Sequence, residues 1–179
     1  MLIAGEWCDS EDGATSDVLN PATGEVIATT PKATISDVER CVQASRAALK
    51  SKEWAMMDPA QRGRVLQKMA AATYANAKSL AALESANNGK TFREALSEVR
   101  YGAWTLEYFA GLSDKIEGST IPVPGSRLNY TLKQPLGVTA HIVPWNFPLQ
   151  LAIRSIAPAL TAGCTVCLLY TSPSPRDEL

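Results

Sequence analysis

Cysteine and histidine can serve as nucleophiles, general bases or metal ligands, and this sequence has four cysteines and one histidine. Of the four cysteines, Cys8 and Cys41 stand alone, whereas Cys164 and Cys167 form a C-x-x-C pair. A zinc or redox site built on that pair would need a second pair or a nearby histidine, and the sequence has neither. The single histidine, His141, falls within a run of mostly apolar residues. We therefore interpret the cysteines as reduced thiols of a cytosolic protein, and His141 as structural rather than catalytic.

The composition is that of a soluble globular protein. The 179 residues are 46% hydrophobic and 20% charged, with 17 basic and 18 acidic side chains. Neither charge forms a long run, which argues against nucleic-acid and membrane-surface partners. The first residues lack the features of a secretory signal, and no stretch approaches the roughly 18 apolar residues of a membrane-spanning helix. We expect a cytoplasmic protein.

The first two thirds of the sequence predict a hairpin followed by three helices. A turn rich in Asn, Pro and Gly at 20–25 separates two short apolar segments, a pattern typical of a β-hairpin. Helix signals follow at intervals, each with an apolar stripe behind it. The predicted signals are a capping box of Ser36 with Glu39, an N-cap and first turn at Asp58-Pro59, a stop at Asn88-Gly89, and a second capping box of Thr91 with Glu94.

The last third of the sequence has a different pattern. Residues 121–125 carry two prolines and predict a stiff extended link, and residues 128–133 alternate like a half-exposed strand. Residues 137–143 predict a buried strand, 144–148 a turn, 149–162 a helix capped by Gly163, and 164–166 the beginning of another strand. Such a βαβ unit implies a parallel sheet, with a ligand crevice at the carboxyl ends of its strands.

Several segments, in this order, resemble the aldehyde dehydrogenase superfamily. They are 20–25, Asn88-Gly89-Lys90, 108–111, Ile121-Pro122, 135–138, 142–149 and 157–164. The resemblance runs from Leu2 to Val166 with compatible spacing. It implies an α/β fold: the N-terminal part of an aldehyde-dehydrogenase-like Rossmann domain, with helices preceding a parallel sheet, plus part of an oligomerisation β-arm.

The resemblance also implies how the chain is organised. Residues 1–119 would form the N-terminal hairpin and helical part of the NAD(P)-binding domain, 120–135 the oligomerisation arm strand, and 136–166 the start of the Rossmann-like βαβ unit. From Cys167 the sequence departs from the family pattern, which continues to a Lys-Pro pair, and it resembles a translated sequencing-library adapter. We therefore expect residues 167–179 to be a non-native tail.

The function that the resemblance implies belongs to the full-length protein. It would oxidise an aldehyde to a carboxylic acid with NAD or NADP, through a thiohemiacetal and a thioester on a cysteine. Asn146 would be catalytic, because a side-chain amide can donate a fixed hydrogen bond where negative charge develops. The implied cofactor-binding residues are Ile142, Val143, Pro144 and Trp145, and the implied substrate-pocket residues are Tyr101, Phe147 and Ile153. Taken without the resemblance, these residues equally fit core packing or, for Asn146, the closing of a turn.

The implied partners are the aldehyde and, for the full-length protein, further copies of the same chain. The metal is left unknown, because Asn87 stands where many relatives carry Asp in a region that helps to bind a monovalent cation. The family's nucleophilic cysteine and glutamate base are not recognisable in this sequence, so we expect the 179-residue chain by itself to be inactive. Two alternatives stay open: a non-catalytic binding or structural protein derived from the front half of the fold, and an acylating semialdehyde dehydrogenase.

Overall fold

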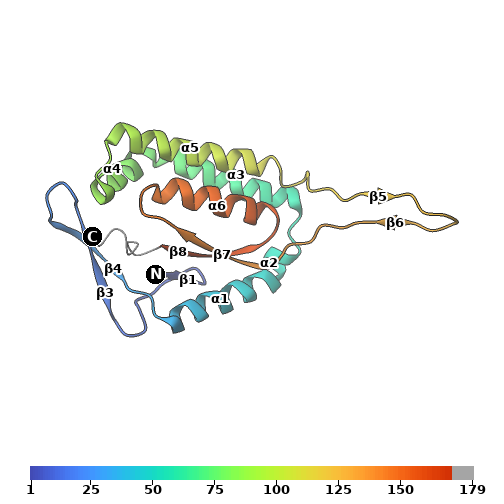
Figure 1. The fold of residues 1–179 in the computed structure, drawn as a ribbon, viewed down its shortest axis with the longest axis horizontal. Helices are drawn as coiled ribbons and strands as arrows, with labels where there is room; N and C mark the ends of the chain where they lie inside the picture. The colour runs from blue at the N-terminus through green and yellow to red at the C-terminus, as the bar shows by residue number, and fades with distance from the viewer. Residues whose placement is uncertain (171–179) are drawn as a thin grey trace.

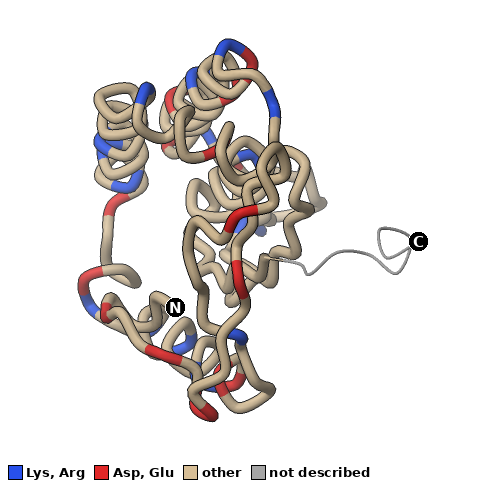
Figure 2. The backbone as a smooth tube through the Cα atoms, turned by 90° about the vertical axis from the view of Figure 1, so that its left-hand side faces the viewer, with Lys and Arg blue, Asp and Glu red and all other residues tan. Residues whose placement is uncertain are grey.

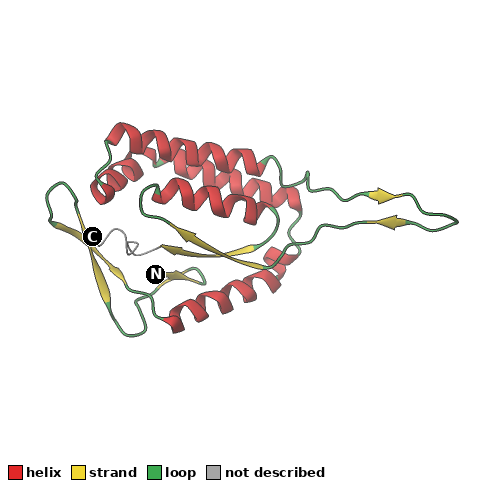
Figure 3. Cartoon of the chain, in the orientation of Figure 1, coloured by secondary structure: helices red, strands yellow, loops and turns green. Residues whose placement is uncertain are grey.

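The structure is a computed structural model that describes residues 1–170. Figures 1 and 3 show a layer of helices, a pair of long strands beneath it, a helix below those strands, and a thin hairpin that projects from one end. In chain order the elements are β1 (Leu2–Ile3), β2 (Glu6–Trp7), β3 (Thr15–Leu19), β4 (Val26–Pro31), α1 (Ile35–Lys50), α2 (Lys52–Ala55), α3 (Pro59–Ala75), α4 (Ala77–Asn88), α5 (Phe92–Ala110), β5 (Thr120–Ile121), β6 (Asn129–Tyr130), β7 (Val138–Val143), α6 (Pro148–Thr161) and β8 (Thr165–Tyr170).

The predicted βαβ unit is present and forms the centre of the fold. Strands β7 and β8 pair in parallel, from Val138 opposite Thr165 to Val143 opposite Tyr170, and α6 connects them. Gly163 ends the α6 connection with φ +87°, a conformation that favours glycine. Strand β8 continues to Tyr170, four residues into the segment that we expect to be a non-native tail. The rest of the predicted tail, 171–179, lies outside the described residues.

Helices cover both faces of this strand pair. Helix α6 packs on β7 and β8 and is itself covered by α5, while α3 and α4 pack against α5; α1 lies on the other face. The largest cluster of buried apolar side chains lies between α3, α5 and α6. It consists of Leu66, Ala70, Leu106, Ala110, Ile153 and Ala157. This packing fixes α6, and with it the turn that joins β7 to α6.

Three of the predicted helix signals have the local geometry that the sequence indicated. Asp58 and Thr91 are N-caps with complete capping boxes, and Gly89 ends α4 in the left-handed region with φ +79°. The long predicted helix breaks at Asn76, which separates α3 from α4. Each of these signals depends on residues within one turn of the helix end, which is why the sequence could indicate them.

The start of α1 differs from our prediction. The capping box is formed by Thr34 and Asp37, not by Ser36 and Glu39. The carboxylate of Asp37 accepts from the Thr34 backbone N–H at 3.0 Å, and also from the hydroxyl of Ser10 at 3.3 Å. The bond from Ser10 comes from a residue 27 positions away, so the local pattern did not reveal it.

The projecting hairpin is the segment predicted as the oligomerisation arm. Strands β5 and β6 pair antiparallel, Thr120 opposite Tyr130 and Ile121 opposite Asn129. We call residues 118–133 the arm. The predicted strand at 128–133 is shorter than expected, because the two strands of the arm pair only with each other among the described residues. A matching hairpin at the other end, β3 with β4, confirms the predicted turn at 20–25.

Candidate active site

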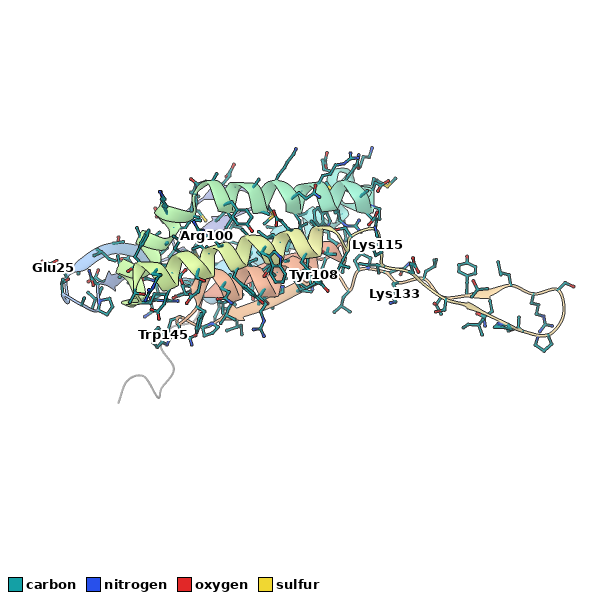
Figure 4. The ribbon with its side chains drawn as sticks, turned by 90° about the horizontal axis from the view of Figure 1, so that it is seen from above. Glu25, Arg100, Tyr108, Lys115, Lys133 and Trp145 are labelled. Carbon is teal, nitrogen blue, oxygen red and sulfur yellow. The ribbon has the colours of Figure 1, made fainter. Side chains whose placement is uncertain are left out.

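The turn between β7 and α6 brings most of the predicted site residues to one place. Side chains alternate along β7, so that Val143 is buried beneath α6 while Ile142 is 68% exposed. The chain then turns through Pro144–Phe147, and Pro148 opens α6 at the first helical position. Trp145 therefore lies at the amino end of α6, far from the arm that carries Lys133 (Figure 4). This is the carboxyl end of a parallel strand, where open α/β sheets bind ligands.

Asn146 lines an open hollow of about 350 Å³. One wall is the turn itself, with Trp145, Asn146 and Phe147, and the other wall comes from the α4–α5 junction, with Asn88, Gly89, Lys90, Glu94 and Glu98. We call this space the Asn146 hollow. Within the described residues, the hydrogen bonds of Asn146 are made through its backbone carbonyl and not through its side chain. The carboxamide is therefore available to a ligand in the hollow.

A nearly buried lysine, Lys90, lies in the wall of the Asn146 hollow that the α4–α5 junction forms. The Lys90 side chain is 13% exposed, and its ammonium donates to Glu84 at 2.9 Å, to Glu98, and to the carbonyl of Asn146 at 3.0 Å. The same ammonium lies 4.5 Å from the centre of the Phe147 ring, a cation–π distance. Lys90 thus connects α4, α5 and the turn after β7.

The charges in this cluster shift the protonation of its members. Burial by itself would lower the pKa of Lys90, but its hydrogen bonds to Glu98 and Glu84 raise it overall. Burial raises the pKa of Glu84, and only part of that increase is offset by Lys90. Lys90 therefore stays an ammonium at neutral pH, with all three N–H bonds directed at oxygen acceptors.

The predicted substrate-pocket residues do not all reach this place. Phe147 lines the Asn146 hollow, but Tyr101 lies on the exposed face of α5, with its ring 5.5 Å from that of Trp104. Ile153 is 5% exposed and belongs to the core cluster between α6 and α5. A Cβ built on Gly102 of α5 would lie 2.9 Å from the Ile153 Cδ1 atom. Ile153 is therefore a packing residue among the described elements, and its role in the substrate pocket stays a prediction.

His141 has the structural role that its position in the strand indicated. Its Nε2 atom lies 2.8 Å from the hydroxyl of Thr139, and its Nδ1 atom is hydrogen-bonded to Ser155 of α6. Burial lowers the pKa of His141, so the imidazole is neutral at pH 7. The ring connects β7 to α6 and does not line the Asn146 hollow.

The cysteines also lie away from the Asn146 hollow. Cys164, just before β8, and Cys167 on β8 are both buried, and the Cys167 sulfur is 2.9 Å from that of Cys41 on α1. All four thiols are free, and no group of three potential metal ligands occurs within residues 1–170. The C-x-x-C spacing is thus not a metal site in the described part of the chain.

The position of Lys90 in the site could not be predicted from the sequence. Asn88-Gly89-Lys90 matches a family signature, but that match assigns no role to the lysine. The ion partners stand six residues before and eight residues after Lys90 and lie on two different helices, α4 and α5, so only the packing of these helices brings them together. The only available signal was the glycine, because a left-handed cap at Gly89 turns the next side chain back between the two helices.

Comparison with known proteins decides the family. The model of the aldehyde dehydrogenase family matches residues 7–176. The chain belongs to the aldehyde dehydrogenase family. It is 44% identical over 165 residues to the hydroxyisobutyraldehyde dehydrogenase of Mycolicibacterium austroafricanum, covering 92% of this chain and 32% of that protein. It is 41% identical over 181 residues to retinal dehydrogenase 2 of Mus musculus, covering 100% of this chain and 35% of that protein.

Solved aldehyde dehydrogenase structures have the same fold. The NAD+ complex of the aldehyde dehydrogenase from Bacillus cereus superposes with a TM-score of 0.92 at 38% identity, covering 94% of this chain and 34% of that one. The betaine aldehyde dehydrogenase of Staphylococcus aureus, also with NAD+, gives a TM-score of 0.91 at 36% identity, covering 95% and 35%. The predicted fold class is confirmed. This aldehyde dehydrogenase chain spans about a third of the length of the relatives that it matches.

Proposed function

We propose that the complete protein containing this chain oxidises an aldehyde to a carboxylic acid with NAD+ or NADP+. Membership of the aldehyde dehydrogenase family supports the reaction class. The observation that carries the proposal is the position of Asn146: an unengaged carboxamide lines a hollow at the carboxyl end of a parallel strand. An aldehyde carbonyl in that hollow would meet a neutral donor that does not titrate.

Asn146 acts on the charge that develops during the reaction. When a thiolate attacks the aldehyde carbon, the C=O double bond becomes a single bond and its electron pair moves to the oxygen. The Asn146 Nδ2–H donates to that oxyanion more strongly than to the neutral carbonyl, and so it lowers the barrier. The amino end of α6 begins two residues later at Pro148, and its helix dipole adds positive potential at the same place.

The end of β7 fits the nicotinamide cofactor that the family implies. Ile142 presents an exposed apolar side chain, and Pro144 and Trp145 follow it at the carboxyl end of the strand. Val143 is 2% exposed, so it would offer the cofactor backbone atoms only. When bound, NAD(P)+ supplies the hydride acceptor. Solved relatives that contain NAD+ support this assignment, and the choice between NAD+ and NADP+ stays open.

A test of the proposal replaces Asn146 in the complete protein. Asn146→Ala removes one oxyanion donor, and we expect kcat to fall by about 10²- to 10³-fold while the protein stays folded. The control is Gln43→Ala, which removes an exposed amide from α1, far from the Asn146 hollow. Initial rates of aldehyde-dependent NAD(P)H formation measure both. An Asn146→Ala protein as fast as the wild type would remove Asn146 from the mechanism.

The partner and location predictions belong to the same proposal. The arm exposes Leu128, Tyr130 and Leu132 to 76%, 56% and 72%, and apolar side chains on a projecting hairpin are typical of subunit contacts. We propose that the complete protein is a homo-oligomer assembled through the arm.

No described helix is long and apolar enough to cross a membrane. Acidic and basic residues are interspersed along the described backbone (Figure 2), in keeping with the proposed absence of nucleic-acid partners and the proposed cytoplasmic location.

A further inference from the structure

We propose that Lys90, held between Glu84 and Glu98, is a positioning residue that fixes the Asn146 peptide and thereby orients the Asn146 carboxamide toward the oxyanion. This role rests on the proposed function and explains how the Asn146 carboxamide is held in place. The α4–α5 junction, which takes no part in the proposed attack on the aldehyde, would then contribute to catalysis by positioning.

The first support is the geometry of the ammonium. Lys90 follows Gly89, whose left-handed conformation ends α4, and precedes Thr91, the N-cap of α5. Its backbone is therefore fixed by two helix ends. Three acceptors, one each from α4, α5 and the turn after β7, occupy its three N–H bonds. A lysine with every donor engaged and 13% exposure has little freedom to change rotamer.

The second support is the atom to which Lys90 donates. That atom is the backbone carbonyl oxygen of Asn146, at 3.0 Å, and the Asn88 side chain donates to the same oxygen at 3.4 Å. A bond to the carbonyl fixes the plane of the 146–147 peptide without engaging the carboxamide. The direction in which the Cα–Cβ bond of Asn146 leaves the backbone is then set, and the side chain remains available in the hollow.

The third support is the second contact that Lys90 makes with the turn, at Phe147. Phe147, at the N-cap position of α6, makes no side-chain capping bond, and Asn146 and Phe147 are both exposed. Lys90 compensates on this side, through the carbonyl bond and through its contact with the Phe147 ring at 4.5 Å. Because preorganised donors stabilise an oxyanion only when their geometry is fixed in advance, this bond has a catalytic consequence.

The test is a double-mutant cycle in the complete protein. Lys90→Met removes the bond to the Asn146 carbonyl, and we expect kcat to fall by about 10- to 100-fold, because misplacing a catalytic group by 1 Å can cost that much. In an Asn146→Ala background the carboxamide is already gone, so Lys90→Met should change kcat by less than about twofold. Lys78→Met, an exposed lysine on α4, is the matched control and should leave kcat unchanged in both backgrounds.

Two further measurements separate positioning from a general loss of structure. Lys90→Arg keeps the charge, but its planar fork cannot reproduce three tetrahedral bonds, so kcat should recover only in part. The dissociation constant of NAD(P)+ should stay within about twofold of the wild type in both Lys90 variants, as expected for a residue outside the cofactor end of β7. If Lys90→Met does not fold by circular dichroism, Lys90→Arg takes its place in the cycle, and its defect should disappear in the Asn146→Ala background in the same way.

The outcomes distinguish this inference from the function on which it rests. If Asn146→Ala is slow and the Lys90 factor is lost in that background, Lys90 acts through Asn146 as proposed. If Asn146→Ala is slow but Lys90→Met costs the same factor in both backgrounds, the positioning role is overturned and the proposed function stands. If Asn146→Ala is as fast as the wild type, the proposed role of Asn146 as an oxyanion donor is overturned, and the positioning role of Lys90 is overturned with it.

Discussion

Asp37 shows how one buried side chain connects distant parts of this chain. Its carboxylate caps α1 through Thr34 and also accepts from the Ser10 hydroxyl and the Glu11 backbone N–H. These hydrogen bonds, led by that of the Thr34 backbone, lower the pKa of Asp37 from 3.8 to about 2. The ionised form is therefore the one that stabilises the N-terminal loop on α1.

The sign of that shift predicts how stability depends on pH. Because the folded pKa is lowered, Asp37 stabilises the fold above its unfolded pKa, near 4, and this contribution is lost as pH falls from about 4 toward 2. We expect Asp37→Asn to unfold at a lower urea concentration at pH 6, and its difference from the wild type to shrink at pH 3. Asp17→Asn, an exposed aspartate on β3, is the control. A difference that grows on acidification would contradict this account.

At the scale of elements, the close approach of α3 to α5 depends on Gly63. Glycine inside a helix ordinarily costs about 0.5–1 kcal/mol relative to alanine. Here a Cβ on residue 63 would lie 2.7 Å from the backbone carbonyl oxygen of Ala110, an atom that cannot move without displacing α5. The steric cost therefore outweighs the helical preference for alanine.

We predict that Gly63→Ala destabilises the protein by about 1–3 kcal/mol, the usual cost of overpacking a core. Gly102→Ala is the matched comparison, because a Cβ there would meet the far end of the flexible Ile153 side chain at 2.9 Å instead of backbone. It should cost less than Gly63→Ala. Thermal unfolding of both variants of the complete protein measures the difference, and equal or reversed costs would contradict the role of Gly63.

The helices and strands show which features of the fold could be predicted from the sequence and which could not. The caps at Asp58 and Thr91 and the parallel unit of β7, α6 and β8 follow from residues close together in the chain. The start of α1 was misplaced because two overlapping local patterns, Thr34 with Asp37 and Ser36 with Glu39, both fit a capping box, and Asp37 is also engaged by Ser10, which is 27 residues away. A local pattern contains no information about such a partner.

The same distinction applies within the candidate site. Asn146 was identified from the motif around it, and the turn places it at the end of β7 as the βαβ pattern implies. Lys90 was not assigned, because its acceptors come from three elements that only tertiary packing brings together. The substrate-pocket role of Ile153 stays a prediction, because an apolar residue on α6 fits a tunnel wall and a core equally well, and the structure shows its contacts within the core cluster.

At the scale of the whole molecule, the two regions to which we assign functions lie at opposite ends. The Asn146 hollow is at the amino end of α6, whereas the arm leaves the body near the carboxyl ends of α5 and α6 (Figures 1 and 4). Contact between subunits through the arm would therefore leave the turn after β7 open to substrate. None of the described cysteines lines the hollow, so the proposed mechanism requires a nucleophile from another part of the complete protein.

The most direct test of the central claim compares the complete protein with the 179-residue chain in one assay. Each is purified and incubated with NAD+ or NADP+ and a set of aliphatic, aromatic and charged aldehydes, and NAD(P)H formation is followed. We predict aldehyde-dependent turnover by the complete protein and none by the 179-residue chain. Failure of the complete protein to oxidise any aldehyde of the set, or turnover by the 179-residue chain alone, would contradict the account.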